Sequence, residues 1–340
     1  MTQSTRAAAR LAFARTALGY PQLELESASS DASFRSYWRT RTVQPSRIVM
    51  DAPPDKEDLG PWLDIAGRLR RAGVNAPEVL AEDRGQGFLL LSDLGTRLYL
   101  PALTAETVEP LYGAALDALQ RMQTGVDCSG LPAYDEIRLR NEMDLLPAWF
   151  LGRHLGIEPD AAQREVIEAA FRALIANALE QPQGFVHRDY HSRNLMLGDA
   201  GPGVIDFQDA VLGPLTYDLV SLLRDCYIAW PEPRVYTWVE QYRQRLHAAG
   251  FATADRAEFA RWFDLMGLQR HIKVLGIFCR LWYRDGKAGY LNDLPLVWHY
   301  TRSVGRRYAE IAPLVDLIEM AIGERDIVRP GSTETASCAR

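Results

Sequence analysis

Lysine is scarce in this chain of 340 residues. Only three of its 38 basic side chains are lysines, Lys56, Lys273 and Lys287, and the others are arginines. None of the three stands in a G-x-x-x-x-G-K-[ST] motif, which excludes a P-loop nucleotide site. Any chemistry that requires a lysine therefore has only three positions available.

Cysteine is also rare, and the motifs that hold metals or dinucleotides are missing. Four cysteines are scattered along the chain without a C-x-x-C pair, so we expect neither a disulfide framework nor a zinc site. No H-E-x-x-H and no complete G-x-G-x-x-G occurs, which excludes zinc-peptidase and dinucleotide-binding motifs. Such cysteine usage is typical of a reducing compartment, and we predict a cytoplasmic protein.

Long apolar runs and basic patches are lacking as well. No stretch approaches the roughly 18 uninterrupted apolar residues of a membrane helix, so no membrane partner is expected. The net charge of −6 argues against a nucleic-acid partner. The basic, alanine-rich N-terminus has a composition like that of a transit peptide, but Ala7, Leu11, Ala14 and Leu18 follow helical spacing and favour an amphipathic first helix.

What is present is an apolar fraction of 47%, enough for a buried core and two lobes. Period-two alternation over 34–42 and 47–50 predicts a β-hairpin. A helix over 59–71 and short strands near 78–81 and 88–91 follow.

Beyond residue 105 the pattern is helical, with 107–122, 137–155, 161–179 and most of 215–320 as helices. One segment is the exception. Short strands over 184–187 and 203–206 bracket a polar loop, a type of segment that usually carries function.

That polar loop contains Asp189 and Asn194, and Asp206 ends the strand that follows. Phosphoryl transfer from ATP requires that charge be neutralised and that the acceptor hydroxyl be oriented. Asn194 and Asp206 offer hard oxygens that suit Mg²⁺, so they are the candidate metal ligands. Asp189 is the candidate catalytic residue, which orients the hydroxyl and accepts its proton.

The residues His187-x-Asp189-x-His191-x-x-Asn194 match a pattern that resembles the aminoglycoside phosphotransferase and choline kinase family. The segment from Gly213 to Asp218 is similar to another segment of that family. The resemblance implies a bilobal, protein-kinase-like α+β fold, with ATP and Mg²⁺ as cofactors. His187 and Asp218 then support the loop structurally.

The resemblance also implies a domain plan. A small antiparallel-sheet nucleotide-binding lobe over 1–95 ends in a hinge near 92–95, and a mainly helical lobe over 96–330 holds the catalytic loop and substrate site. Residues 331–340 are predicted to form a frayed tail. We expect a monomer that binds a small-molecule sugar.

Individual nucleotide-binding residues follow from the same resemblance, and the candidate substrate residues follow from the carboxylates and cations that a sugar acid requires. Ser33, Phe34 and Arg35 look like the loop that covers the nucleotide, and Ser92 and Leu94 look like the hinge whose backbone holds adenine. The candidate substrate-binding residues are Glu142, Asp144, His191, Asp209 and Lys273, with Arg270 and Arg284 as alternative cations for a lactyl carboxylate.

Within the family, the segments 31–35, 50–54 and 205–210 are similar to the anomeric kinases of N-acetylmuramate and N-acetylglucosamine. That similarity implies formation of the sugar 1-phosphate in cell-wall recycling. Two alternatives stay open. One is an aminoglycoside or other amino-alcohol O-phosphotransferase, and the other is a catalytically impaired nucleotide-binding pseudokinase.

The pseudokinase alternative arises from one departure. The family places a phosphate-binding lysine on its third strand, whereas the aligned position here is Met50 or Asp51. An arginine can bind phosphate in bidentate fashion, and Arg35 is favoured over Arg39 and Arg47 because it lies nearest the covering loop.

Overall fold

The chain divides into two compact units in this computed structural model, which describes residues 3–30, 34–251 and 254–329. Unit 1 comprises Met1–Asp127 and Arg193–Ala210, and unit 2 comprises Cys128–Ser192 and Val211–Arg340. Asp189 therefore belongs to unit 2, whereas Asn194 and Asp206 belong to unit 1. The limits of the two lobes predicted from the sequence stay predictions, and the tail over 331–340 lies outside the described residues.

Unit 1 is built on a five-stranded antiparallel sheet of order β1-β2-β3-β5-β4. Its elements are α1 Gln3–Leu18, β1 Leu25–Ser30, β2 Ser36–Thr40, β3 Arg47–Asp51, α2 Leu59–Arg71, β4 Val79–Asp83, β5 Phe88–Ser92, α3 Tyr99–Ala102, α4 Val108–Gly125, β7 Leu195–Met196 and β8 Gly203–Val204. The first helix, the hairpin, the 59–71 helix and the two short strands are thereby confirmed. Strand β1 was not predicted, because its sequence LESASS lacks apolar alternation.

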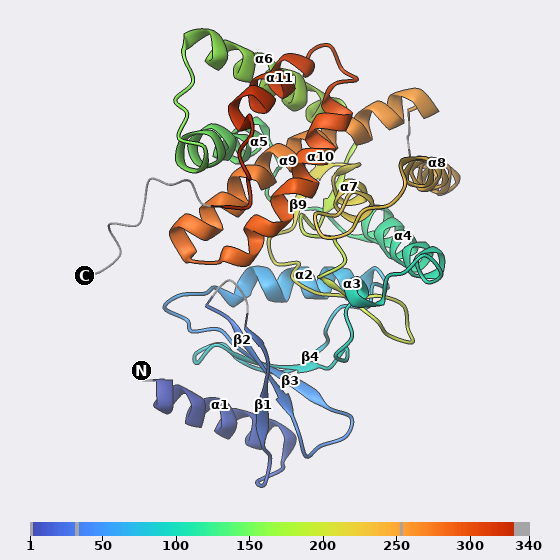
Figure 1. Ribbon diagram of the computed structural model, residues 1–340. Helices are drawn as coiled ribbons and strands as arrows, with labels where there is room; N and C mark the ends of the chain where they lie inside the picture. Colours follow the sequence, from blue (N-terminus) through green and yellow to red (C-terminus); the bar gives the residue numbers. More distant parts are fainter. Residues whose placement is uncertain (1–2, 31–33, 252–253, 330–340) are drawn as a thin grey trace, which may run out of the picture. The chain divides into compact units, whose positions relative to one another are not determined.

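The basic N-terminal helix α1 is an integral part of unit 1. It packs against β3 and β5 (Figure 1). Asp51, buried at the end of β3, pairs with Arg6 at 2.6 Å and with Arg10 at 2.8 Å. The Arg10 guanidinium also lies 3.6 Å from the centre of the Trp38 ring. These contacts satisfy the Asp51 carboxylate, which would be costly to bury alone.

Unit 2 is mainly helical. Its elements are α5 Glu136–Met143, the π-helix η1 Leu146–His154, α6 Ala161–Glu180, β6 Gln183–Val186, β9 Val211–Pro214, α7 Tyr217–Leu223, α8 Glu232–Ala248, α9 Arg256–Asp285, the 3-10 helix η2 Ala288–Asp293, α10 Leu294–Gly305 and α11 Ala312–Ile322. Helix α9 is central, since it contacts η1, α6, α7 and α10 (Figure 1). At Gly276 a Cβ would lie 2.3 Å from the backbone of Leu145, so this crossing requires glycine.

One detail of the helical prediction is wrong. The single helix predicted over 137–155 is α5 followed by η1, with Pro147 near the start of the second element, where its missing N–H costs no hydrogen bond. The short strands predicted on either side of the polar loop are confirmed as β6 and β8, and they belong to separate sheets, since β6 pairs with β9 and β7 pairs with β8.

The α+β fold class is confirmed, with an antiparallel sheet in unit 1 and a mainly helical unit 2. Within the described residues, no helix has both the length and the apolar character that crossing a bilayer requires.

Candidate active site

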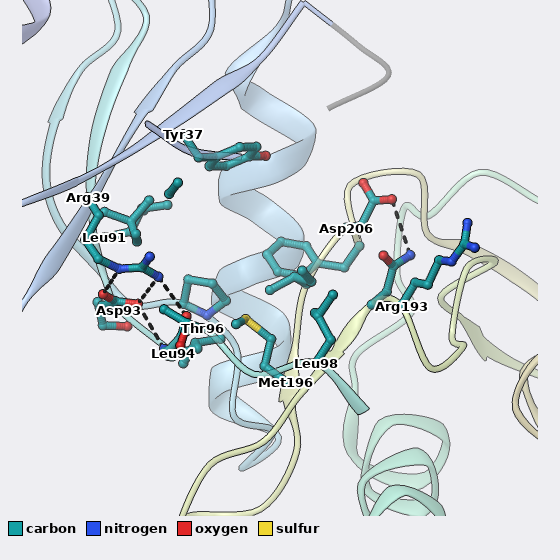
Figure 2. A pocket seen from close by; sticks show the side chains of 18 of the residues that line it. Tyr37, Arg39, Leu91, Asp93, Leu94, Thr96, Leu98, Arg193, Met196 and Asp206 are labelled. Atoms are coloured by element: carbon teal, nitrogen blue, oxygen red, sulfur yellow. Dashed lines mark hydrogen bonds and ion pairs between the residues drawn. The ribbon is translucent and has the colours of Figure 1, made fainter. Parts of the chain in front are cut away.

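A pocket of about 500 Å³ lies wholly within unit 1 (Figure 2). This volume is in the range of small-molecule sites. Apolar side chains of the sheet and of β7 line it, among them Ile48, Leu91 and Met196, and Asn194 and Asp206 also line it. The pocket thus combines an apolar slot with oxygen ligands, as a nucleotide that carries phosphates requires.

The backbone that follows β5 runs along this pocket and is fixed by Asp93. The Asp93 carboxylate accepts hydrogen bonds from Arg39 Nε at 2.6 Å and Gly95 N at 2.9 Å (Figure 2). It also accepts one from Ser46 Oγ at 2.7 Å. Burial alone would raise the pKa of Asp93, but these donors outweigh burial and lower the pKa. Asp93 therefore stays ionised and holds the segment 92–95 rigid.

Ser92 and Leu94, the two predicted adenine-binding positions, both line the pocket. Ser92 exchanges hydrogen bonds with Glu78, since its N–H donates to the Glu78 carbonyl and its Oγ accepts from Glu78 N. Leu94 packs on Gly203, where a Cβ would lie 3.0 Å from the Leu94 side chain. Among residues 3–30, 34–251 and 254–329, the Leu94 backbone finds no hydrogen-bond partner, so its amide is available to a ligand.

Asn194 and Asp206 are brought together by the two-stranded β7–β8 sheet. Asn194 Nδ2 lies 3.4 Å from Asp206 Oδ2 (Figure 2). Gln208 Nε2 donates to Asp206 Oδ1 at 3.0 Å. Asp206 adopts φ +65°, a left-handed conformation that is strained for a residue other than glycine. Its side chain remains one-third exposed, at 33%.

This pair fits a magnesium ion. Both residues carry hard oxygen atoms, and Mg²⁺ is usually held by one or two protein ligands together with substrate phosphates. No group of three or more His, Cys, Asp or Glu side chains suited to a metal occurs in the part of the chain that the structure describes.

Arg35 is the cation that lies near this pair. Its Nη2 is 3.7 Å from Asp206 Oδ1, and its side chain is only 9% exposed. Met50, one of the two positions aligned with the family's lysine, is fully buried and pairs in register with Tyr37 of β2. Side chains two residues apart along a strand point to the same face of the sheet, so Arg35 lies on the face that carries Tyr37 and its partner Met50.

The other two arginines considered from the sequence have different partners. Arg39 is held by Asp93, as described above. Arg47 Nη1 donates to the carbonyls of Pro45 and Ser46, both at 3.0 Å. The geometry therefore agrees with the preference for Arg35.

Phe34, at the end of the predicted covering loop, is 65% exposed. Its N–H donates to Glu57 Oε1 at 3.0 Å, and Lys56 Nζ lies 5.8 Å from the centre of its ring. Ser33 lies outside the described residues. The described part of this loop is thus braced by the segment after β3.

In unit 2, the loop that carries Asp189 is held by Asp218 of α7. Asp218 accepts hydrogen bonds from His187 N at 2.6 Å and Arg188 N at 3.0 Å. Burial raises the pKa of Asp218 to about 7, although these two donors oppose the shift. His187 is fully buried and its Nδ1 accepts from Asp189 N at 3.3 Å. These contacts are those expected of residues that support the loop.

Asp189 is half-buried and surrounded by cationic groups. Burial alone would raise its pKa, but Lys273 and Arg270, with smaller contributions from His191 and His187, lower it. Asp189 is therefore a carboxylate at neutral pH and can accept a proton.

The structure brings only some of the predicted substrate residues close to one another. Glu142 and Lys273 form an ion pair of 3.0 Å in unit 2, and Lys273 contributes to the electrostatic environment of Asp189. Asp144, two residues from Glu142 on the helix, instead pairs with Arg140 at 2.9 Å. The His191 ring packs edge-on against Tyr227, with centroids 5.4 Å apart.

Asp209 differs from these residues, because it is exposed and belongs to unit 1, where it accepts a hydrogen bond from Gln208 at 3.3 Å. Of the alternative cations, Arg284 is exposed and paired with Asp285, and Arg270 is buried.

Sequence reasoning missed Arg188, Tyr134 and Tyr217, which contact Glu142 or Lys273. For Arg188 a signal existed, since it stands inside the catalytic-loop pattern.

Known proteins are similar to this chain in sequence. A model of the phosphotransferase enzyme family matches residues 24–260. An N-acetylmuramate/N-acetylglucosamine kinase of Pseudomonas aeruginosa is 48% identical over 300 residues, which cover 88% of each chain. A protein of the same name from Neisseria meningitidis is 42% identical over 316 residues, 91% of this chain and 94% of the relative.

Solved structures share the fold at low sequence identity. A choline/ethanolamine kinase family protein from Mesorhizobium loti has a TM-score of 0.61 and 13% identity, covering 94% of this chain and all of that chain. The ADP-bound aminoglycoside phosphotransferase APH(2'')-Ib has a TM-score of 0.59 and 14% identity, covering 87% of this chain and 98% of that chain. The match of the family model and the similarity of the relatives show that the chain belongs to the phosphotransferase enzyme family.

Proposed function

We propose that this protein transfers the γ-phosphoryl group of ATP to the anomeric hydroxyl of N-acetylmuramate, N-acetylglucosamine or both, and so forms the sugar 1-phosphate. The observation that carries the proposal is that relatives named for these two sugars are 42–48% identical over about nine-tenths of the chain. A monomeric, cytoplasmic enzyme of cell-wall recycling is part of the proposal.

The pocket of unit 1 supports the nucleotide half of this reaction. Adenine lies in the apolar slot against Leu94, whose backbone amide is available for it. Arg35 binds the phosphates in place of the absent third-strand lysine. Asn194 and Asp206 hold Mg²⁺, which when bound neutralises charge on the phosphates.

Asp189 supports the acceptor half. Its carboxylate orients the anomeric hydroxyl and accepts its proton as the hydroxyl oxygen attacks the γ-phosphorus. The bond between that phosphorus and the oxygen that bridges it to the β-phosphate breaks, and ADP leaves. The proton on Asp189 then passes to solvent.

A panel of acceptors tests the proposal. Release of ADP is measured with N-acetylmuramate, N-acetylglucosamine, an aminoglycoside and choline, and ³¹P NMR identifies a phosphate at the anomeric carbon. We expect turnover of at least one of the two sugars and an anomeric phosphate signal.

Two results would overturn the proposal. Turnover of the aminoglycoside or of choline, with neither sugar phosphorylated, would assign the protein to another acceptor class. Binding of Mg-ATP without turnover of any acceptor would indicate a nucleotide-binding module that has lost catalysis.

A further inference from the structure

Glu142 is the centre of a buried charged network in unit 2. Its side chain is 12% exposed and pairs with Lys273 Nζ at 3.0 Å. It also accepts hydrogen bonds from the Tyr134 hydroxyl and from the Arg188 guanidinium. Helices α5 and α9 and the catalytic loop thus meet at one carboxylate.

Lys273 is committed to this network. Its side chain is only 8% exposed, and besides Glu142 it donates to the Tyr217 hydroxyl at 3.2 Å. A buried ammonium group is tolerated only when it is paired and hydrogen-bonded, and removal of one partner leaves an uncompensated charge. Lys273 therefore makes its contacts with other buried side chains of the protein.

The network reaches Asp189 through the residue before it. The Arg188 N–H donates to Asp218, its carbonyl accepts from Arg270 Nη1 at 2.9 Å, and its side chain reaches Glu142. Arg188 is held at φ +78°, a left-handed conformation rare for a residue other than glycine. These three contacts set the direction in which the chain enters Asp189.

The charges around Asp189 come from several elements. His187 and His191 lie on its own loop, Arg270 and Lys273 on α9, Asp218 on α7, and the buried Cys226 follows α7. Glu142 on α5 is the acidic partner of Lys273. Of the groups that lower the pKa of Asp189, Lys273 has the largest effect.

We propose that Lys273 is a positioning residue which, paired with Glu142 and linked through it to Arg188, holds the Asp189 carboxylate in place. The assignment replaces the expected contact between Lys273 and a substrate carboxylate. It rests on the proposed function only in that Asp189 is the base.

The decisive experiment compares Lys273→Met with wild type on both sugars. The two sugars differ by the lactyl carboxylate, which only N-acetylmuramate carries. We expect kcat to fall about 10²-fold to the same extent with both sugars, as for a misplaced catalytic group, with little change in KM for either. Loss of the Lys273 charge also raises the pKa of Asp189, so the acid limb of kcat/KM moves to higher pH.

Three control variants separate charge from packing. Lys273→Arg keeps the charge and should keep the acid limb near its wild-type position. Tyr217→Phe removes a hydrogen bond without changing charge, so the acid limb should not move. Glu142→Gln removes a negative charge near Asp189 while Lys273 stays positive. The pKa of Asp189 should then fall, and the acid limb of kcat/KM should move to lower pH. Thermal unfolding identifies any variant that fails to fold, in which case Lys273→Arg and Glu142→Gln carry the test.

A loss of activity confined to N-acetylmuramate would show that Lys273 binds the substrate carboxylate, and would overturn the proposal. An acid limb that stays in place in both Lys273→Met and Glu142→Gln would also overturn it. If wild type phosphorylates neither sugar, the proposed function fails, but the pH profiles still test the role of Lys273 with whichever acceptor the panel identifies.

Discussion

A carboxylate in the pocket of unit 1 and one in the charged network of unit 2 differ in the distances to their partners and in how far they are exposed. In unit 1, Asp206 accepts a hydrogen bond from Gln208 at 3.0 Å, lies 3.4 Å from Asn194 and 3.7 Å from Arg35, and a third of its side chain is exposed. In unit 2, Glu142 has three close partners and is 12% exposed.

This difference separates binding groups from positioning groups. An exposed carboxylate can still accept a metal ion, whereas a buried group with several close partners holds a fixed geometry and has little capacity for a ligand. Substitutions in the pocket should therefore weaken ligand binding. Those in the network should lower turnover or stability while ligand affinity remains.

The largest effect is expected from Asp206→Ala. Without this carboxylate the metal ion loses a ligand and the charge balance of the phosphates is disturbed, so turnover should fall by more than the ~10²–10⁴-fold typical of losing a general base. Affinity for Mg-ATP should fall with it. Steady-state release of ADP and calorimetric titration with Mg-ATP measure both quantities.

Asp189→Asn is the matched comparison in unit 2. It removes the proton acceptor but leaves the pocket of unit 1 intact, so turnover should fall ~10²–10⁴-fold while affinity for Mg-ATP is unchanged. Equal residual turnover in the two variants, or weakened Mg-ATP binding by Asp189→Asn, would contradict the division into binding and positioning groups.

Features encoded in short stretches were accessible from the sequence. Asn194 and Asp206 were grouped from the sequence by their chemistry and by the motif they match, and in the structure they flank the β7–β8 hairpin and lie 3.4 Å apart. Local alternation likewise predicted β2 and β3, and helical periodicity predicted α2 and α6.

Features that depend on distant parts of the chain were not accessible. Glu142 and Lys273 meet because α5 packs on α9, and periodicity places neither side chain opposite the other. The pairing of β6 with β9 was missed for the same reason, and no strand was predicted over 211–214.

Within the pocket, the next largest effect is expected from Arg35→Met. A charge-assisted hydrogen bond to phosphate is worth about 1.5–3 kcal/mol, so KM for ATP should rise roughly 10- to 100-fold. Arg47→Gln is the matched control, because Arg47 contacts only backbone carbonyls in its own turn. An unchanged KM in Arg35→Met, or an equal rise in Arg47→Gln, would show that another cation binds the phosphates.

The smallest effect on activity is expected from Asp218→Asn, which should lower turnover by less than about tenfold because the amide keeps one acceptor for the loop N–H groups. Its main effect concerns the pH dependence of stability. The pKa of Asp218 is raised from an ordinary value of 3.8 to about 7 by burial. Between these two values the unfolded chain loses this proton and the folded chain keeps it.

The folded state therefore binds more protons in that window, and this residue makes the free energy of unfolding fall as pH rises from about 4 to 7. The change is of the order of 1 kcal/mol for each unit of pKa difference. Urea unfolding of wild type and Asp218→Asn across this range isolates it, since other titrating groups are common to both proteins. A difference in stability that stays constant with pH would mean that the two N–H donors keep Asp218 ionised, and that the loop before Asp189 is held by a charge and not by a neutral acid.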